Sequence, residues 1–114
     1  MAVTSVDQEI LKVLIDFLPP SSVLGDGRKI VTTAGTAEKL VSTATSCKGV
    51  IIVAEEDNTG TIVIGSSTVV AAKATRRGVP LNAGDSIMIL IDDLSKIYID
   101  STVSGEGVTF IYGG

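Results

Sequence analysis

The side chains that could support catalysis are carboxylates and lysines, because the chain contains no histidine and a single cysteine. The lack of histidine excludes the Ser-His-Asp triad and the Cys-His pair, and together with the lone cysteine it excludes ordinary zinc sites. Asp92, Asp93 and Asp100 flank a predicted strand, and residues 55–57 (Glu-Glu-Asp) lead into a predicted turn. An acid/base pair or a Ca²⁺ site is conceivable there, but a calcium loop needs oxygen donors at every second position. We expect solvated turns and strand ends, and no catalytic residue, metal or cofactor.

Cysteine and glycine offer little more chemistry. Cys47 stands just before the apolar run at residues 50–53 (Val-Ile-Ile-Val), which favours a small buried side chain over a reactive thiolate. Residues 25–27 (Gly-Asp-Gly) and 105–107 (Gly-Glu-Gly) each resemble part of a phosphate loop. Neither precedes a predicted helix whose N-terminus would bind the anion, so we interpret both as turns.

Composition points to one domain and to protein partners. A chain of 114 residues has the length of one domain. The net charge is −4 and the basic residues are scattered, with Arg76-Arg77 as the only basic pair, so nucleic acid is not expected as a partner. The mean hydropathy of +0.47 is high for a chain with no membrane segment. We therefore expect some apolar surface to be buried in a homo-oligomer.

The first 18 residues predict an amphipathic helix that Pro19-Pro20 ends. Its apolar residues recur with the spacing of one helical face: Val6, Ile10, Val13, Leu14 and Phe17. Lys12 and Asp16 interrupt the segment, so it is not expected to span a bilayer. It lacks the pattern of a signal peptide, and we expect the protein in the cytoplasm until assembly. The sequence leaves open whether this helix packs on its own domain or on a partner.

From residue 28 onward, short β-branched runs alternate with turn residues, and the spacing leaves no room for crossover helices. This predicts an all-β fold, an antiparallel β-sandwich or jelly-roll-like barrel with a short N-terminal α-helix. Residues 1–27 form the helix and connector, and residues 28–114 the β-sandwich domain. The predicted strands cover residues 28–33, 37–42, 50–54, 61–64, 68–74, 86–91, 96–100 and 108–112. Because residues 87–91 (Ile-Met-Ile-Leu-Ile) have no polar face, we expect both sides to be covered, one by the core and the other by the helix or a neighbouring subunit.

Six segments of the β region resemble small structural proteins of tailed bacteriophages. They are residues 31–37 (VTTAGTA), 47–50 (CKGV), 58–65 (NTGTIVIG), 80–87 (PLNAGDSI), 92–100 (DDLSKIYID) and 105–112 (GEGVTFIY). The resemblance runs from about residue 30 to residue 112 and implies a β-sandwich virion component. Residues 69–77, which include Arg76 and Arg77, are longer than in the shortest proteins of this kind.

The resemblance and the lack of catalytic groups predict a capsid decoration or cement protein. We expect a trimer that binds the phage major capsid protein on the virion surface and stabilises the head, without nucleic acid or membrane as a partner. The expected attachment residues are Val6, Ile10, Val13, Leu14 and Phe17, with Arg76 and Arg77 as a polar rim. The alternatives are a tail, collar or baseplate component, a receptor- or carbohydrate-binding module of a fibre and, third, a hydrolase that uses Asp92 or Asp93.

Overall fold

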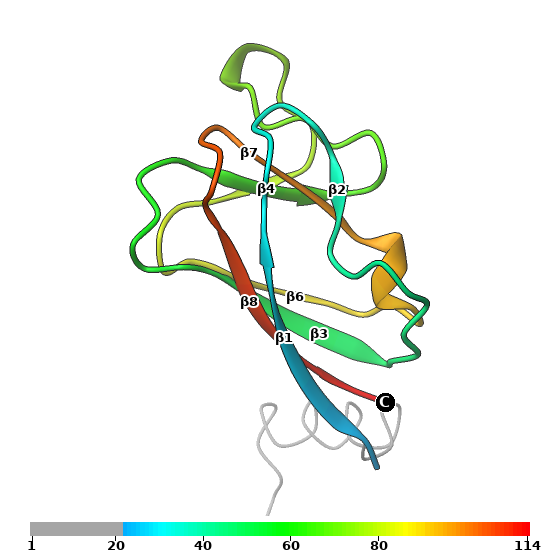
Figure 1. Cartoon of the computed structure of the whole chain (residues 1–114). Coiled ribbons are helices and arrows are strands. Elements are labelled where there is room, and N and C mark those ends of the chain that lie inside the picture. The colour runs from blue at the N-terminus through cyan, green and yellow to red at the C-terminus, as the bar shows by residue number, and fades with distance from the viewer. Residues whose placement is uncertain (1–21) are drawn as a thin grey trace, which may run out of the picture.

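The structure, a computed structural model, describes residues 22–114 as two facing antiparallel sheets of four strands each (Figure 1). The strand order is β1-β8-β3-β6 in sheet 1 and β2-β7-β4-β5 in sheet 2. The strands are β1 (Leu24–Ile30), β2 (Glu38–Lys39), β3 (Gly49–Ala54), β4 (Ile62–Gly65), β5 (Val79–Leu81), β6 (Ser86–Ile89), β7 (Tyr98–Ser101) and β8 (Gly107–Gly113). Two short 3-10 helices, η1 (Lys73–Thr75) and η2 (Leu94–Lys96), complete the elements. The predicted all-β sandwich-like fold is confirmed, and the predicted N-terminal helix lies outside the described residues.

The core lies between the two sheets and follows the two-residue period of the strands. On β3, Val50, Ile52 and Ala54 are buried, whereas Ile51 between them points outward. Sheet 2 contributes Ile62, Ile64, Leu81 and Ile99 to the same cluster, and sheet 1 adds Val108 and Phe110. The two-residue period of the strands therefore turns one apolar face of each sheet toward the shared core.

The outer face of sheet 2 is covered by loops. Val63 of β4 points away from the shared core, yet it is fully buried because Val69 and Ala71 of the β4–β5 connection pack on it. Ala37 and Tyr98 pack against the same cluster. Both faces of sheet 2 are thus shielded from water near its centre.

A buried carboxylate joins those loops to the sheet. Asp100 lies directly opposite Val63 in the β4–β7 register, so it shares the outer face, and its exposed fraction is 0%. Its oxygens accept hydrogen bonds from the backbone N–H groups of Gly35 (2.9 Å), Ala71 (2.8 Å) and Ser101 (2.8 Å). The expectation that Asp100 is a solvated strand end is therefore wrong. The carboxylate tolerates burial because charged hydrogen bonds from three donors replace its water shell.

The predicted strand at residues 68–74 is also wrong. Val69 and Ala71 alternate inward as in a strand, but the N–H of Ala71 donates to Asp100 and not to a neighbouring strand. Only the isolated bridge between Val70 and Arg77 forms, and η1 follows. On the side of β4 away from β7, the pairing strand is β5, which the sequence pattern missed because Pro80 lies within it. Proline is tolerated there because β5 is an edge strand of sheet 2.

Strand β1 starts at Leu24, inside the segment predicted to be a connector. Gly25 and Gly27 are strand residues and not turn residues. A Cβ atom on Gly25 would overlap the ring of Tyr112, and one on Gly27 would overlap the ring of Phe110. These glycines are required because two aromatic rings of β8 lie across β1 on the inner face.

Replacing Asp100 with alanine should lower the free energy of unfolding by about 3 kcal/mol or more, because three buried N–H groups lose their acceptor. Asp100→Asn, which retains one carbonyl acceptor, should cost less. Urea denaturation monitored by circular dichroism measures both changes. The control is Asp26→Ala at an exposed position of β1, which should change stability by no more than about 0.5 kcal/mol. Equal effects at positions 26 and 100 would contradict this role of Asp100.

Candidate functional site

The outer face of sheet 1 carries a contiguous group of exposed apolar side chains. The strand register places Ile51 of β3 directly opposite both Ile111 of β8 and Met88 of β6. Their exposed fractions are 42%, 43% and 64% respectively. Since directly opposite residues point to the same side of a sheet, these three side chains form one row across three strands.

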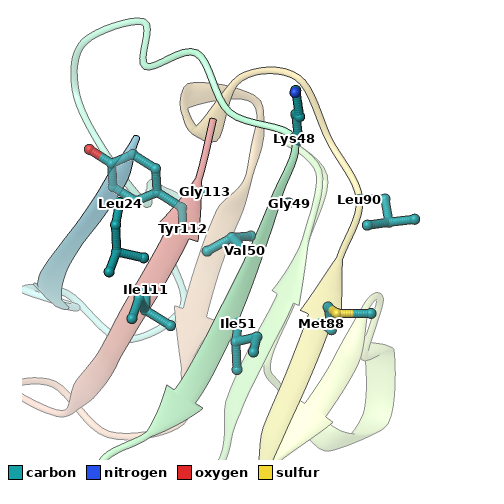
Figure 2. Close-up of a pocket in the computed structure, with 10 residues that line it drawn as sticks. All are labelled: Leu24, Lys48, Gly49, Val50, Ile51, Met88, Leu90, Ile111, Tyr112 and Gly113. Atoms are coloured by element: carbon teal, nitrogen blue, oxygen red, sulfur yellow. The ribbon is translucent and has the colours of Figure 1, made fainter. Parts of the chain in front are cut away.

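Next to this row, two glycines leave a groove. Leu24 of β1 lies opposite Gly113 of β8, which in turn lies opposite Gly49 of β3. On the other side of Gly49, the closest side-chain atom is Cδ2 of Leu90, 3.2 Å from where a Cβ would stand. Leu24 and Leu90 are 77% and 61% exposed and flank a groove of about 360 Å³ (Figure 2). We refer to Leu24, Ile51, Met88, Leu90 and Ile111 as the apolar half-face.

The other half of the same outer face is polar. Here the row across the four strands begins with Arg28 of β1 and ends with Ser86 of β6. Thr109 of β8 and Val53 of β3 lie between them. Arg28 forms a bidentate ion pair with Glu55, in which Nη2 lies 3.0 Å from Oε2. The hydrogen bond from Arg28 lowers the pKa of Glu55. The apolar half-face is therefore bounded by charged groups at one end of the sheet.

The two sheets differ in what covers their outer faces. Loops cover the centre of sheet 2, whereas no described residue covers the apolar half-face of sheet 1. Residues 87–91 show the difference most clearly. Ile87, Ile89 and Ile91 pack against the core, but Met88 and Leu90 remain exposed. Within residues 22–114, the expectation that both sides of this run are covered is met on the inner side alone.

The structure separates Arg76 and Arg77 from this surface. Arg76 Nε and Nη2 donate to the carbonyl oxygen of Ala71 at 3.1 and 2.9 Å, and the backbone of Arg77 pairs with Val70. Both arginines therefore belong to the loop over sheet 2 and do not border the apolar half-face. The other predicted attachment residues, which are Val6, Ile10, Val13, Leu14 and Phe17, lie outside the described part of the chain.

The candidate catalytic carboxylates Asp92 and Asp93 are engaged in hydrogen bonds and an ion pair within the fold. Asp93 Oδ1 accepts hydrogen bonds from the N–H groups of Thr45 (3.0 Å) and Ser95 (2.9 Å), which lowers its pKa and caps η2. Asp92 pairs with Lys96 at 2.8 Å on the surface. Within residues 22–114, no group of three or more carboxylate or cysteine side chains could hold a metal ion. No helix in the described range is long and apolar enough to cross a membrane.

Cys47 is buried, as expected. Its thiol Sγ lies 3.1 Å from the carbonyl oxygen of Ile91, to which it donates. Burial raises the pKa of Cys47, and the negative charges of Asp93 and Asp92 raise it further. At neutral pH the side chain is therefore a thiol, which is a poor nucleophile.

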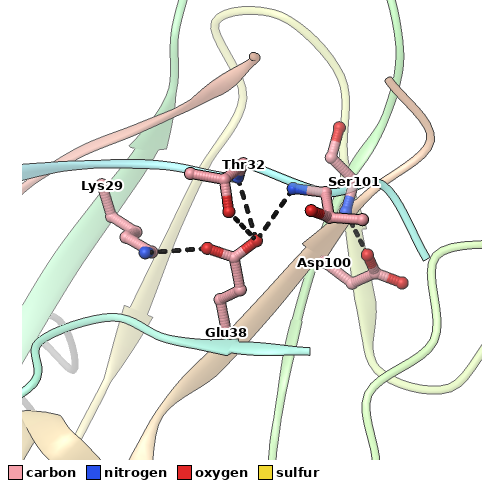
Figure 3. Close-up of polar contacts among 6 residues, drawn as sticks. Lys29, Thr32, Glu38, Asp100 and Ser101 are labelled. Atoms are coloured by element: carbon pink, nitrogen blue, oxygen red, sulfur yellow. Dashed lines mark hydrogen bonds and ion pairs between the residues drawn. The ribbon is translucent and has the colours of Figure 1, made fainter. Parts of the chain in front are cut away.

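Two further carboxylates tie loops together. Glu38 accepts from Lys29 Nζ (2.9 Å) and from the N–H groups of Thr32 (2.9 Å) and Thr33 (3.1 Å) (Figure 3). Burial favours its neutral acid, but these hydrogen bonds outweigh that effect and lower its pKa. Glu106 likewise accepts from the N–H groups of Thr59 and Gly60, which lowers its pKa.

No protein-family model, curated protein or solved structure matches the chain. What the protein does must therefore be inferred from its own residues and surfaces. Among the surfaces of the described residues, the apolar half-face is the one whose composition favours binding.

Acidification should destabilise the fold through these carboxylates. Glu38, Asp93 and Glu106 have depressed pKa values in the folded state, so their stabilisation is present above the ordinary values of 4.5 for Glu and 3.8 for Asp. It is lost as pH falls through the lower folded values. Urea denaturation curves should be recorded at several pH values between 7 and 3. The urea concentration at half unfolding should decrease once the pH drops below about 4.5. Glu106→Gln should make this decline shallower, and an unchanged or rising midpoint on acidification would contradict the assignment.

Proposed function

We propose that the protein is a non-catalytic structural component of a tailed-phage virion, specifically a capsid decoration or cement protein. In this role it self-associates and binds the major capsid protein on the surface of the head. The observation that carries the proposal is the apolar half-face, which no described residue covers. An exposed apolar surface bounded by polar residues is typical of a protein interaction site.

The size of the half-face favours a multivalent assembly. Its five side chains are about half exposed, so their complete burial would contribute roughly 4–8 kcal/mol at most. Association itself costs an estimated 4–15 kcal/mol. One such contact is therefore weak, whereas several equivalent contacts in a symmetric oligomer reinforce one another. This supports the expected trimer and its attachment to a repetitive shell.

The stabilising effect on the head requires no chemical step. A protein that binds the assembled shell and not its free subunits shifts the equilibrium toward the shell by mass action. The carboxylates of Asp93, Asp100 and Glu106 are engaged in capping and in loop contacts, which is consistent with a rigid body that presents a surface.

A receptor- or carbohydrate-binding module fits less well. Sugar binding commonly uses exposed aromatic rings in a pocket. Of the aromatic residues within the described range, Phe110 is buried and Tyr98 and Tyr112 are half-buried. Placement in the tail, collar or baseplate remains the alternative within the structural class, and immunogold labelling distinguishes the two. A cement protein would be distributed over the head, and a tail component would be confined to one end of the particle.

The double variant Met88→Asp/Leu90→Asp should lose most of its binding to phage heads, because two charges would stand in the apolar half-face. Co-sedimentation of the purified protein with heads that lack it measures the loss, which we expect to exceed tenfold in apparent affinity. That corresponds to more than about 1.4 kcal/mol.

The matched control is Ser86→Asp, which adds a charge to the same outward side of β6 but in the polar half of the face. It should bind heads like the unmodified protein. If the unmodified protein does not sediment with heads at all, the proposed function is wrong.

A further inference from the structure

The described chain begins at the rim of the groove. Leu24, the first residue of β1, lines the groove, and the backbone groups of Val23 and Gly114 pair just beyond it (3.0 and 2.9 Å). This pairing extends β1 past Leu24 toward the end of the sandwich where the C-terminus also lies (Figure 1). The preceding residues of the chain are therefore attached next to an apolar groove that no described residue fills.

The sequence of those residues suits the groove. Residues 1–18 predict a helix with one apolar face, and residues 6–17 would span about 18 Å at 1.5 Å per residue. Four strands spaced by about 4.8 Å make a sheet roughly 15–19 Å wide. A helix of that length would cross sheet 1 from β1 to β6. Its apolar stripe would then face the apolar half-face, whose row on β8, β3 and β6 ends beside the exposed Asp26 of β1.

We propose that the N-terminal segment of a neighbouring copy of this chain occupies the groove. The inference rests on the proposed function for the existence of an assembly, and it names what joins the copies. Each copy would give its N-terminal segment and receive one, so both the groove and the apolar stripe of the segment would be covered.

The route of the chain favours exchange over self-docking. Proline fixes its own backbone and restricts the preceding residue to extended conformations, so residues 18–20 favour an extended path. Val23 is held in line with β1 by its pairing with Gly114. To cover its own groove with a helix that crosses the strands, the chain would have to turn sideways and also rise by the roughly 10 Å that separates packed layers, all within the four residues between Leu18 and Val23. Docking on a neighbouring copy places no such requirement on these residues.

A complementation experiment with full-length chains tests the proposal. The segment variant carries Ile10→Asp and Leu14→Asp and retains its groove, whereas the groove variant carries Met88→Asp and Leu90→Asp and retains its segment. Size-exclusion chromatography with light scattering should show an oligomer for the unmodified protein and the monomer mass of 11.7 kDa for each variant alone. Mixed in equal amounts, the two variants should form a 1:1 complex of about twice the mass of a monomer.

Each competing arrangement gives a different result. If the segment covers its own groove, the unmodified protein and the mixture both stay monomeric. If copies meet face to face through the apolar half-face, the segment variant alone oligomerises. If the segments bind one another, the groove variant alone oligomerises. Any of these three results would overturn the proposal.

Controls separate misfolding and failure of the proposed function from failure of this inference. Circular dichroism and thermal melting confirm that each variant is folded, and the single variant Leu90→Gln replaces the groove variant if the double change prevents folding. Ser86→Asp should oligomerise like the unmodified protein. If the variants complement each other but the oligomer ignores phage heads, exchange stands and the proposed function is wrong. If the unmodified protein binds heads but the two variants do not complement each other, the proposed function stands and the exchange is wrong.

Discussion

Each sheet of this protein has two faces, and every apolar face must be removed from water. The inner faces of both sheets do this together by forming the shared core. The outer face of sheet 2 does it with its own loops, where Val69 and Ala71 cover Val63. The apolar half of the outer face of sheet 1 has no such cover among residues 22–114. The proposals for assembly and for exchange of the N-terminal segment follow from this uncovered outer face of sheet 1.

Asp100 explains why the two outer faces differ. Its buried carboxylate binds the N–H groups of Gly35 and Ala71, one from each of the two loops that lie over sheet 2. A buried carboxylate is costly unless it is fully hydrogen-bonded, so the position of these loops is closely specified. On the two central strands of sheet 1, the outer row carries Ile51 and Ile111, which have no polar group to bind a loop. The outer face of sheet 1 therefore leaves apolar side chains exposed, whereas loops cover the centre of the outer face of sheet 2.

Local pattern in the sequence predicted much of the fold. The short β-branched runs at residues 50–54 and 108–112, bounded by turn residues, placed β3 and β8 almost at their observed bounds. The prediction failed where a distant residue determines the local structure. Within residues 68–74, where a strand was predicted, the N–H of Ala71 donates to Asp100, 29 residues away in the chain, and not to a neighbouring strand. Gly25 and Gly27 resembled turn residues because the rings that require them lie on β8, at the other end of the sequence.

The candidate site was even less visible. The run at residues 87–91 indicated that a second covered side was needed, and Met88 and Leu90 belong to the apolar half-face. Ile51, Ile111 and Leu24 join them through the order β1-β8-β3-β6, which pairs strands far apart in the sequence. The groove depends on Gly49 facing Gly113, a coincidence of register that no local pattern reveals.

The central claim is that the apolar half-face is buried when copies of the protein come together. Oxidative footprinting of Met88 in the full-length protein, followed by mass spectrometry over a range of protein concentrations, tests it most directly. Exposed methionine is oxidised to the sulfoxide, whereas a packed thioether is shielded. We expect Met88 to become protected over the concentration range in which the oligomer forms. Reactivity of Met88 that stays high and independent of concentration while the protein oligomerises would contradict the claim.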